Sequence, residues 1–219
     1  NKVIADGFPF SLTIGIYASL VVVFAGILFG SVCALRQNKL IDRFFMVLST
    51  LGSTIPSFVL ATGFLFLFSK TLGLVPAFGV DEVAGYIGPV LVIGAFPLSS
   101  ITRLTRTSLV EVQQQDYIRT ARSKGISEFK VIYKHALRNA LLPVVTYIGP
   151  MVASIVTGSF VIETVFGIPG VGQLFTDSIV NRDYPLIMGI TVFFAVLLVL
   201  AVLIVDLVYV LIDPRIKLD

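Results

Sequence analysis

Five long apolar runs constrain this chain more than any other feature of its sequence. A membrane-spanning helix needs about 20 mostly apolar residues, and runs of about this length occupy residues 10–35, 44–68, 85–102, 140–162 and 186–212. Because 56% of the 219 residues are hydrophobic and only 13% are charged, a soluble enzyme is excluded. An outer-membrane barrel is also excluded, since its strands would read as short alternating segments. We predict an all-α membrane protein, a polytopic helical bundle with five transmembrane helices.

The distribution of basic residues predicts the orientation of this bundle. Thirteen of the sixteen Lys and Arg residues fall in the loops 36–43 and 103–139 and in the tail 213–219. By the positive-inside rule these segments are cytoplasmic, so the C-terminus lies inside. The same asymmetry accounts for the net charge of +3 without a nucleic-acid partner. Residues 1–9 then lie outside with no basic n-region of a signal peptide before them, and we expect a sixth, N-terminal helix upstream.

Proline and glycine interrupt several of the predicted spans. Pro56, Pro97, Gly149 and Gly158 lie inside three of them, and each proline removes a backbone donor and favours a kink. Such breaks are tolerated where protein or a water-filled cavity satisfies the backbone. These residues therefore suggest a gate or transport path, while ordinary helix packing is an equally good explanation.

The polar loop 103–139 predicts two cytoplasmic helices. Asp116 and Ser127 can cap them, and Gly125 can end the first. The second helix has an apolar face and an opposite basic face that holds Lys130, Lys134 and Arg138. The predicted apolar face consists of Phe129, Ile132, Tyr133, Ala136 and Leu137. This pattern fits a helix on an anionic lipid surface, an elbow packed on its own bundle, or a docking element, and periodicity does not separate the three.

The residues of this loop resemble a known family. The run DYIRTARSKG at 116–125, followed by HALRNALLP at 135–143, is similar to the cytoplasmic EAA loop of ABC importer permeases, and more narrowly to the peptide/nickel (oligopeptide/dipeptide, B-type) branch. Further matches are IPSF at 55–58, RLTR at 103–106, IETVFG at 162–167 and NRDYP at 181–185. The chain departs from the general EAA pattern at Arg119, which replaces an acidic residue.

The resemblance implies a fold, a function and partners. It implies the type I ABC importer permease fold, with residues 1–219 forming a single permease domain in the inner (plasma) membrane of a prokaryote. This domain would form half of a peptide translocation path, with a second homologous permease, two cytoplasmic ATPases and an external solute-binding protein as partners. It also implies that the loop 103–139 forms a coupling element for the ATPases. The coupling residues implied are Arg119, Thr120, Ala121, Arg122, Ser123, Lys124 and Gly125.

Other residues argue against enzymatic or cofactor chemistry in this chain. No G-x-x-x-x-G-K-[ST] motif is present, so we expect ATP and magnesium on the partner ATPases and no cofactor or metal here. His135 is the single histidine, and no Cys/His cluster accompanies it.

Alternatives remain for two acidic residues and for the substrate. Asp206 lies within the last span, where an ionisable group is costly unless paired; it is either a packing or gating contact or the carboxylate of a proton- or ion-coupled carrier. Glu163 lies in the predicted extracytoplasmic loop 163–185, where it is either part of an outer gate or a solvated loop residue. Relatives with this loop also carry nickel, glutathione or oligosaccharides, and the sequence does not exclude these substrates.

Overall fold

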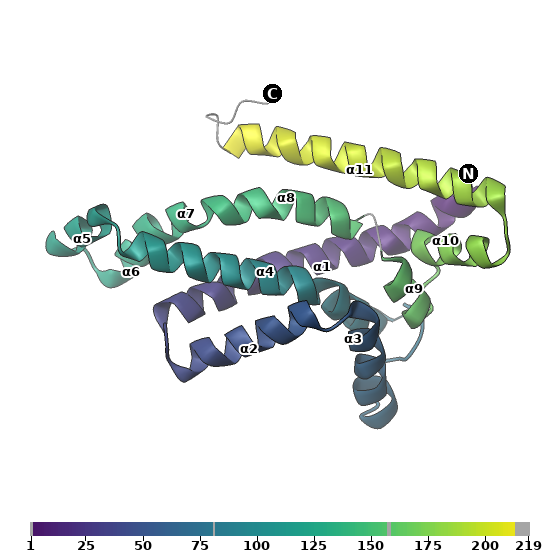
Figure 1. Ribbon diagram of the computed structural model, residues 1–219, viewed down its shortest axis with the longest axis horizontal. Helices are drawn as coiled ribbons and strands as arrows, with labels where there is room; N and C mark the ends of the chain where they lie inside the picture. Colours follow the sequence, from purple (N-terminus) through teal and green to yellow (C-terminus); the bar gives the residue numbers. More distant parts are fainter. Residues whose placement is uncertain (1, 81, 157–158, 213–219) are drawn as a thin grey trace. The chain divides into compact units, whose positions relative to one another are not determined.

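The computed structural model describes residues 2–80, 82–156 and 159–212, and of Asp206 and residues 208–212 it describes the backbone alone. This part of the chain is helical, with turns and no strand; Figure 1 shows the order of the helices. The α-helices are α1 (Lys2–Leu35), α2 (Leu40–Thr54), α3 (Ser57–Phe64), α4 (Ile87–Gln113), α5 (Asp116–Ser123), α6 (Glu128–Lys130), α7 (Leu137–Ala140), α8 (Leu142–Val156), α9 (Phe160–Phe166), α10 (Val171–Val180) and α11 (Tyr184–Ile212). Two π-helical segments, Leu65–Thr71 and Val131–Ala136, and a 3-10 turn, Val83–Tyr86, complete them.

The helices agree with five membrane crossings. Three of them, Lys2–Leu35, Val83–Gln113 and Tyr184–Val205, are long and apolar enough to cross a membrane, and two bent helix pairs raise the number to as many as five. One pair is interrupted at Pro56, which precedes α3 with φ −56° and ψ 142°. The predicted interruption at Pro56 is therefore confirmed.

Three predicted span boundaries were wrong. The helix α1 begins at Lys2, eight residues before the predicted start at residue 10. The helix α4 continues beyond residue 102 to Gln113, because Ile101, Thr105 and Leu109 extend a buried face on which an α-helix gains packing. The fourth predicted span also ends earlier than residue 162. Its helix α8 ends at Val156, and Ser159 has an extended backbone and caps the next helix, α9.

The chain divides into two compact units. Unit 1 contains Asn1–Val21, Ile55–Ala95 and Gly149–Asp219, and unit 2 contains Val22–Thr54 and Phe96–Ile148. In unit 2, α1 and α4 approach each other closely. A Cβ atom on Gly26 would lie 2.6 Å from Cγ2 of Ile101, and one on Gly30 would lie 2.6 Å from the carbonyl oxygen of Thr102. Glycines four residues apart allow this contact, as is common between helices in membranes.

In unit 1, aromatic side chains from different helices pack against one another. The Phe64 and Phe166 rings lie 6.2 Å apart, and Phe8 packs edge-on against Phe193 at 5.2 Å. The helix α11 contributes Phe193 to this packing, although only 6% of the residues in its most apolar window are buried. Ile190 is fully buried among them.

Candidate functional site

The elbow, residues 116–140, turns sharply between α5 and α6. Gly125 has a φ of +74°, a conformation that glycine adopts without the strain of a Cβ atom. Its amide donates to the carbonyl of Arg122 at 2.9 Å, and the amide of Ile126 donates to the carbonyl of Ala121 at 3.4 Å. These two bonds are those of a Schellman motif, which ends a helix at a left-handed residue. The predicted turn at Gly125 is confirmed.

The caps of the elbow helices differ in part from the prediction. Gln115 holds the N-cap position of α5, so Asp116 is its first helical residue rather than its cap. Ser127 does occupy the N-cap of α6, although its side chain makes no capping hydrogen bond. Glu128 instead pairs with Arg122 across the turn, through contacts of 2.7 Å from Nη2 to Oε1 and 3.1 Å from Nε to Oε2. This bidentate ion pair links α5 to α6 across the turn.

The elbow has its own apolar core. Five of its residues form a cluster with Ala34 of α1 and Leu109 of α4, and Ile126 and Leu137 pack against it. The five are Ile118, Ala121, Val131, Ala136 and Ala140. Ala121 therefore faces the chain's own core, where its small size lets α5 approach the neighbouring helices. The other predicted coupling residues are exposed: Arg119, Thr120, Arg122, Ser123, Lys124 and Gly125.

Two residues of the apolar face predicted for the second elbow helix are not buried within the chain. Phe129 and Tyr133 are 67% and 55% exposed, and their rings lie against each other at 4.4 Å. The buried residues are Val131 and Ala136. The reason is that Val131–Ala136 is π-helical, so residues five apart share a face, whereas the prediction assumed an α-helical period.

A second candidate site surrounds Glu163, which lies in α9 and is 1% exposed. Its Oε2 atom accepts hydrogen bonds from the amides of Gly172 at 2.8 Å and Gln173 at 3.3 Å. Both amides belong to the first turn of α10, where backbone donors lack partners within the helix. Ser11 of α1 hydrogen-bonds the same carboxylate and accepts from the amide of Val171 at 3.0 Å. Glu163 thus joins α9, α10 and α1 within unit 1.

The glycines that follow Glu163 leave room for its side chain. A Cβ atom on Gly170 would collide with the Glu163 Oε2 atom, and one on Gly172 would lie 2.9 Å from it. Gly167 has a φ of +59° and ends α9 with a second Schellman motif, in which the Ile168 amide donates to the Glu163 carbonyl at 2.9 Å. The glycine-rich run after α9 is therefore shaped around one buried carboxylate.

Burial raises the pKa of the Glu163 carboxyl above its ordinary value, and hydrogen bonds from Ser11, Gly172 and Gln173 offset part of this rise. Replacing Glu163 with alanine is expected to destabilise the protein by about 2–4 kcal/mol, because helix-terminal amides lose their acceptor and a cavity remains. Glu163→Gln keeps an acceptor oxygen and nearly the same volume, so its loss should be smaller. Thermal unfolding of the purified protein followed by circular dichroism compares the two variants.

The same carboxyl predicts a pH effect. The pKa of Glu163 is raised in the folded protein, so the protonated carboxyl favours folding. This contribution to the free energy of unfolding is fully present below the ordinary pKa of glutamate and is lost as the pH rises through the pKa in the folded protein. The unfolding temperature of the wild type should therefore rise on acidification more than that of Glu163→Gln. Equal responses of the two proteins would contradict an ionisable role for this group.

The predicted gate and path residues belong to both units of the chain. Pro56 is exposed at the start of α3 in unit 1, Pro97 is buried inside α4 in unit 2, and Gly149 is buried inside α8. Gly158 lies outside the described residues, as does the side chain of Asp206.

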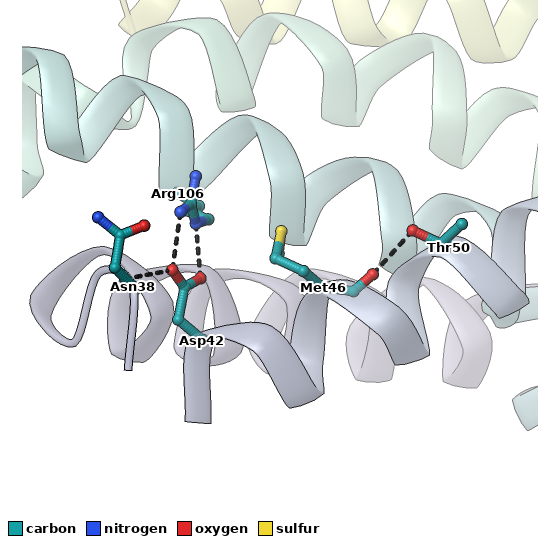
Figure 2. A network of polar contacts seen from close by, with 5 residues as sticks. All are labelled: Asn38, Asp42, Met46, Thr50 and Arg106. Carbon is teal, nitrogen blue, oxygen red and sulfur yellow. Dashed lines mark hydrogen bonds and ion pairs between the residues drawn. The ribbon is translucent and has the colours of Figure 1, made fainter. Parts of the chain in front are cut away.

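The sequence analysis missed an ion pair between α2 and α4. Figure 2 shows the Arg106 guanidinium against the Asp42 carboxylate, with contacts of 2.6 Å from Nε to Oδ1 and 2.7 Å from Nη2 to Oδ2. The amide of Asn38 donates to Asp42 Oδ2 at 2.8 Å. Arg103 reaches α2 as well, and its Nη2 donates to the Ser53 hydroxyl at 2.6 Å. Asp42 lies in the predicted polar loop 36–43, just before the second apolar run, so its position in the sequence gave no sign of this pairing.

Comparison with known proteins supplies the context for both sites. Residues 26–218 match the family described as binding-protein-dependent transport system inner membrane component. The chain is 50% identical to the dipeptide transport system permease protein DppB of Bacillus subtilis (strain 168) over 218 residues, 100% of this chain and 71% of that protein. It is 43% identical to the oligopeptide transport system permease protein OppB of Haemophilus influenzae over 219 residues, 99% of this chain and 72% of that protein.

Two solved structures share the fold. A chain of the inward-facing MetNI methionine ABC transporter superposes with a TM-score of 0.75 at 16% identity, with 94% of each chain covered. A chain of an amino acid ABC transporter with histidines gives a TM-score of 0.73 at 15% identity, with 98% of this chain and 94% of that chain covered. The predicted ABC importer permease fold is confirmed.

Proposed function

Because this chain belongs to the family of binding-protein-dependent transport system inner membrane components, we propose that it is the permease subunit of a peptide importer. The observation that carries this proposal is the 50% identity to a dipeptide permease along the whole chain. The similar oligopeptide permease supports peptides as the substrate class over nickel, glutathione or oligosaccharides. In this proposal residues 1–219 act as one permease domain and contribute half of the path.

The elbow is the element we propose to couple transport to ATP. The sequence has no phosphate-binding loop of its own, so the energy comes from ATP and magnesium on two partner ATPases. The exposed residues around Gly125 and the basic side chains of Arg119, Lys124, Lys130 and Lys134 suit a groove with acidic residues. The elbow is anchored to α1 and α4 through its buried cluster, so a force on its exposed side would reach the membrane helices.

The remaining assignments follow from the predicted orientation. We propose that the elbow and the C-terminus are cytoplasmic, in the inner membrane of a prokaryote, and that a solute-binding protein delivers substrate to the opposite side. Glu163 then belongs to the outer segment, where we assign it to holding α10 in place. Pro56, Pro97, Gly149 and Gly158 mark helices of the path, shared with a second homologous permease, and Asp206 makes a packing or gating contact.

Uptake of labelled di- to pentapeptides, and in parallel of nickel, tests this function in cells that lack the chain and in cells with it restored. ATP depletion and proton uncoupling are applied separately. Peptide uptake that returns with the chain and follows ATP supports the proposal. Uptake of nickel alone would overturn the peptide assignment, and uptake that follows only the proton gradient and is lost in Asp206→Asn would favour the ion-coupled carrier.

Cysteine crosslinking tests which side of α5 meets the ATPase. Thr120→Cys should crosslink efficiently to a cysteine in the partner's groove, because residue 120 is exposed. Ala121→Cys should crosslink poorly, since that position packs in the elbow's own core. The native Cys33 is buried and contributes little background. Efficient crosslinking from position 121 and none from 120 would reverse the proposed docking side.

A further inference from the structure

The helix α2 is held to its neighbours in unit 2 by contacts of two kinds. Phe45 stacks on Phe29 of α1 with ring centroids 4.6 Å apart, an apolar contact that tolerates sliding. The Asp42–Arg106 pair is directional, because both nitrogens of one guanidinium edge meet both oxygens of the carboxylate. Such a fork fixes orientation as well as distance. The polar pair therefore sets the position of α2 along α4.

The pair is also shielded from solvent and fixed by the backbone. The Asp42 side chain is 3% exposed and that of Arg106 is 23% exposed. In the turn before α2, Asn38 has a φ of +64°. Its backbone amide donates a hydrogen bond to Oδ2 of Asp42 (Figure 2). A buried carboxylate that lost its partner would remain as an uncompensated charge. Separation of α2 from α4 at this point is therefore opposed by more than a surface ion pair could supply.

The pair lies one helical turn from the core of the elbow. Arg106 and Leu109 are three residues apart in α4, so they lie on neighbouring positions of one stiff helix. Leu109 belongs to the buried cluster that anchors the elbow. The opposite end of α2 leads to the break at Pro56. The chain of contacts thus runs from the elbow through α4 and Arg106 to Asp42 and α2.

We propose that Asp42 and Arg106 are positioning residues that make α2 move together with the elbow. This inference rests on the proposed function, in which the elbow receives the movement of the ATPases. Without the pair, the elbow and α4 would still move when ATP is hydrolysed, but α2 would follow incompletely. ATP would then be consumed with less transport.

The test uses the complete transporter, with partner permease, ATPases and binding protein, in proteoliposomes. Peptide imported per ATP hydrolysed is measured for the wild type and for Asp42→Asn, Arg106→Lys and the exchange of both residues, D42R with R106D. We expect the ratio to fall about tenfold in Asp42→Asn, a coupling loss within the usual range, with ATP hydrolysis kept within about twofold. Arg106→Lys keeps the charge but loses the fork, so its ratio should fall less. The exchange should restore at least half of the wild-type ratio.

Thr50→Val is the matched control, because Thr50 also lies in α2 but its hydroxyl donates to Met46 of the same helix at 2.9 Å (Figure 2). Its ratio should equal that of the wild type. An unchanged ratio in Asp42→Asn would overturn the proposal. So would failure of every pair variant to assemble, the exchange included, because the pair would then serve folding alone. Peptide import by the wild type tests the proposed function separately, since its absence would be seen before any variant is compared.

Discussion

Replacing Gly125 with valine is expected to abolish transport while leaving membrane insertion intact. Gly125 has a φ of +74°, and a β-branched residue in this conformation costs about 1–3 kcal/mol. The turn would relax toward another conformation, and the two hydrogen bonds that end α5 would be lost. The exposed side of α5 would then no longer be presented in a fixed direction. Peptide uptake and the amount of permease in the membrane are measured side by side.

Gly125→Asn is the matched control for this variant. Apart from the two adjacent residues, no heavy atom lies within 4 Å of a Cβ placed on Gly125, so space is not limiting and backbone strain distinguishes the substitutions. Asparagine tolerates the left-handed region better than other residues with a Cβ, and its transport should stay close to that of the wild type. Full transport by Gly125→Val would refute the assignment of the elbow as the coupling element.

The second large effect is expected at Gly30, where valine should prevent stable folding of unit 2. A Cβ atom there would lie 2.5 Å from Cβ of Thr105 and 2.6 Å from the backbone oxygen of Thr102, so α1 and α4 would have to separate. Overpacking of this kind costs about 1–3 kcal/mol and more where backbone must move. Thermal unfolding and gel filtration of the purified protein should show a large loss of folded material.

Gly63→Val provides the comparison for Gly30→Val. Apart from its chain neighbours and the backbone of its own helix, no heavy atom lies within 4 Å of a Cβ on Gly63, so the same substitution in this other helix should leave the unfolding temperature nearly unchanged. If both valines destabilise equally, close packing of α1 on α4 does not explain the effect, and helix propensity does not either, because glycine is the poorer helix former of the two.

The spans and the break at Pro56 could be predicted because they depend on local properties. Continuous apolar runs identify membrane helices whatever their neighbours are, and a proline disrupts helical hydrogen bonding wherever it stands. The turn at Gly125 was predictable for the same reason, since glycine after a basic last turn is a common helix end.

The contacts between helices could not be predicted in this way. Asp42 and Arg106 are 64 residues apart, and no local pattern reveals that α2 and α4 are neighbours. The exposure of Phe129 and Tyr133 goes with the π-helical segment Val131–Ala136. A π-helix has more residues in each turn than an α-helix, and a pattern analysed with a 3.6-residue period does not reveal it. The role of Glu163 as an acceptor for α10 required knowledge of where α10 begins.

Few of residues 184–205 in α11 are buried, and this bears on how freely this part of the sequence can change. Lipid tails are fluid and adapt to any apolar shape, so wherever they surround α11 its positions should accept exchange among Leu, Ile, Val and Phe. Ile190 should be an exception, because its side chain is fully buried in the protein. Closely packed protein atoms do not adapt to a side chain of another shape. Among residues 184–205, a library of apolar substitutions should therefore find Ile190 more restricted than its exposed neighbours.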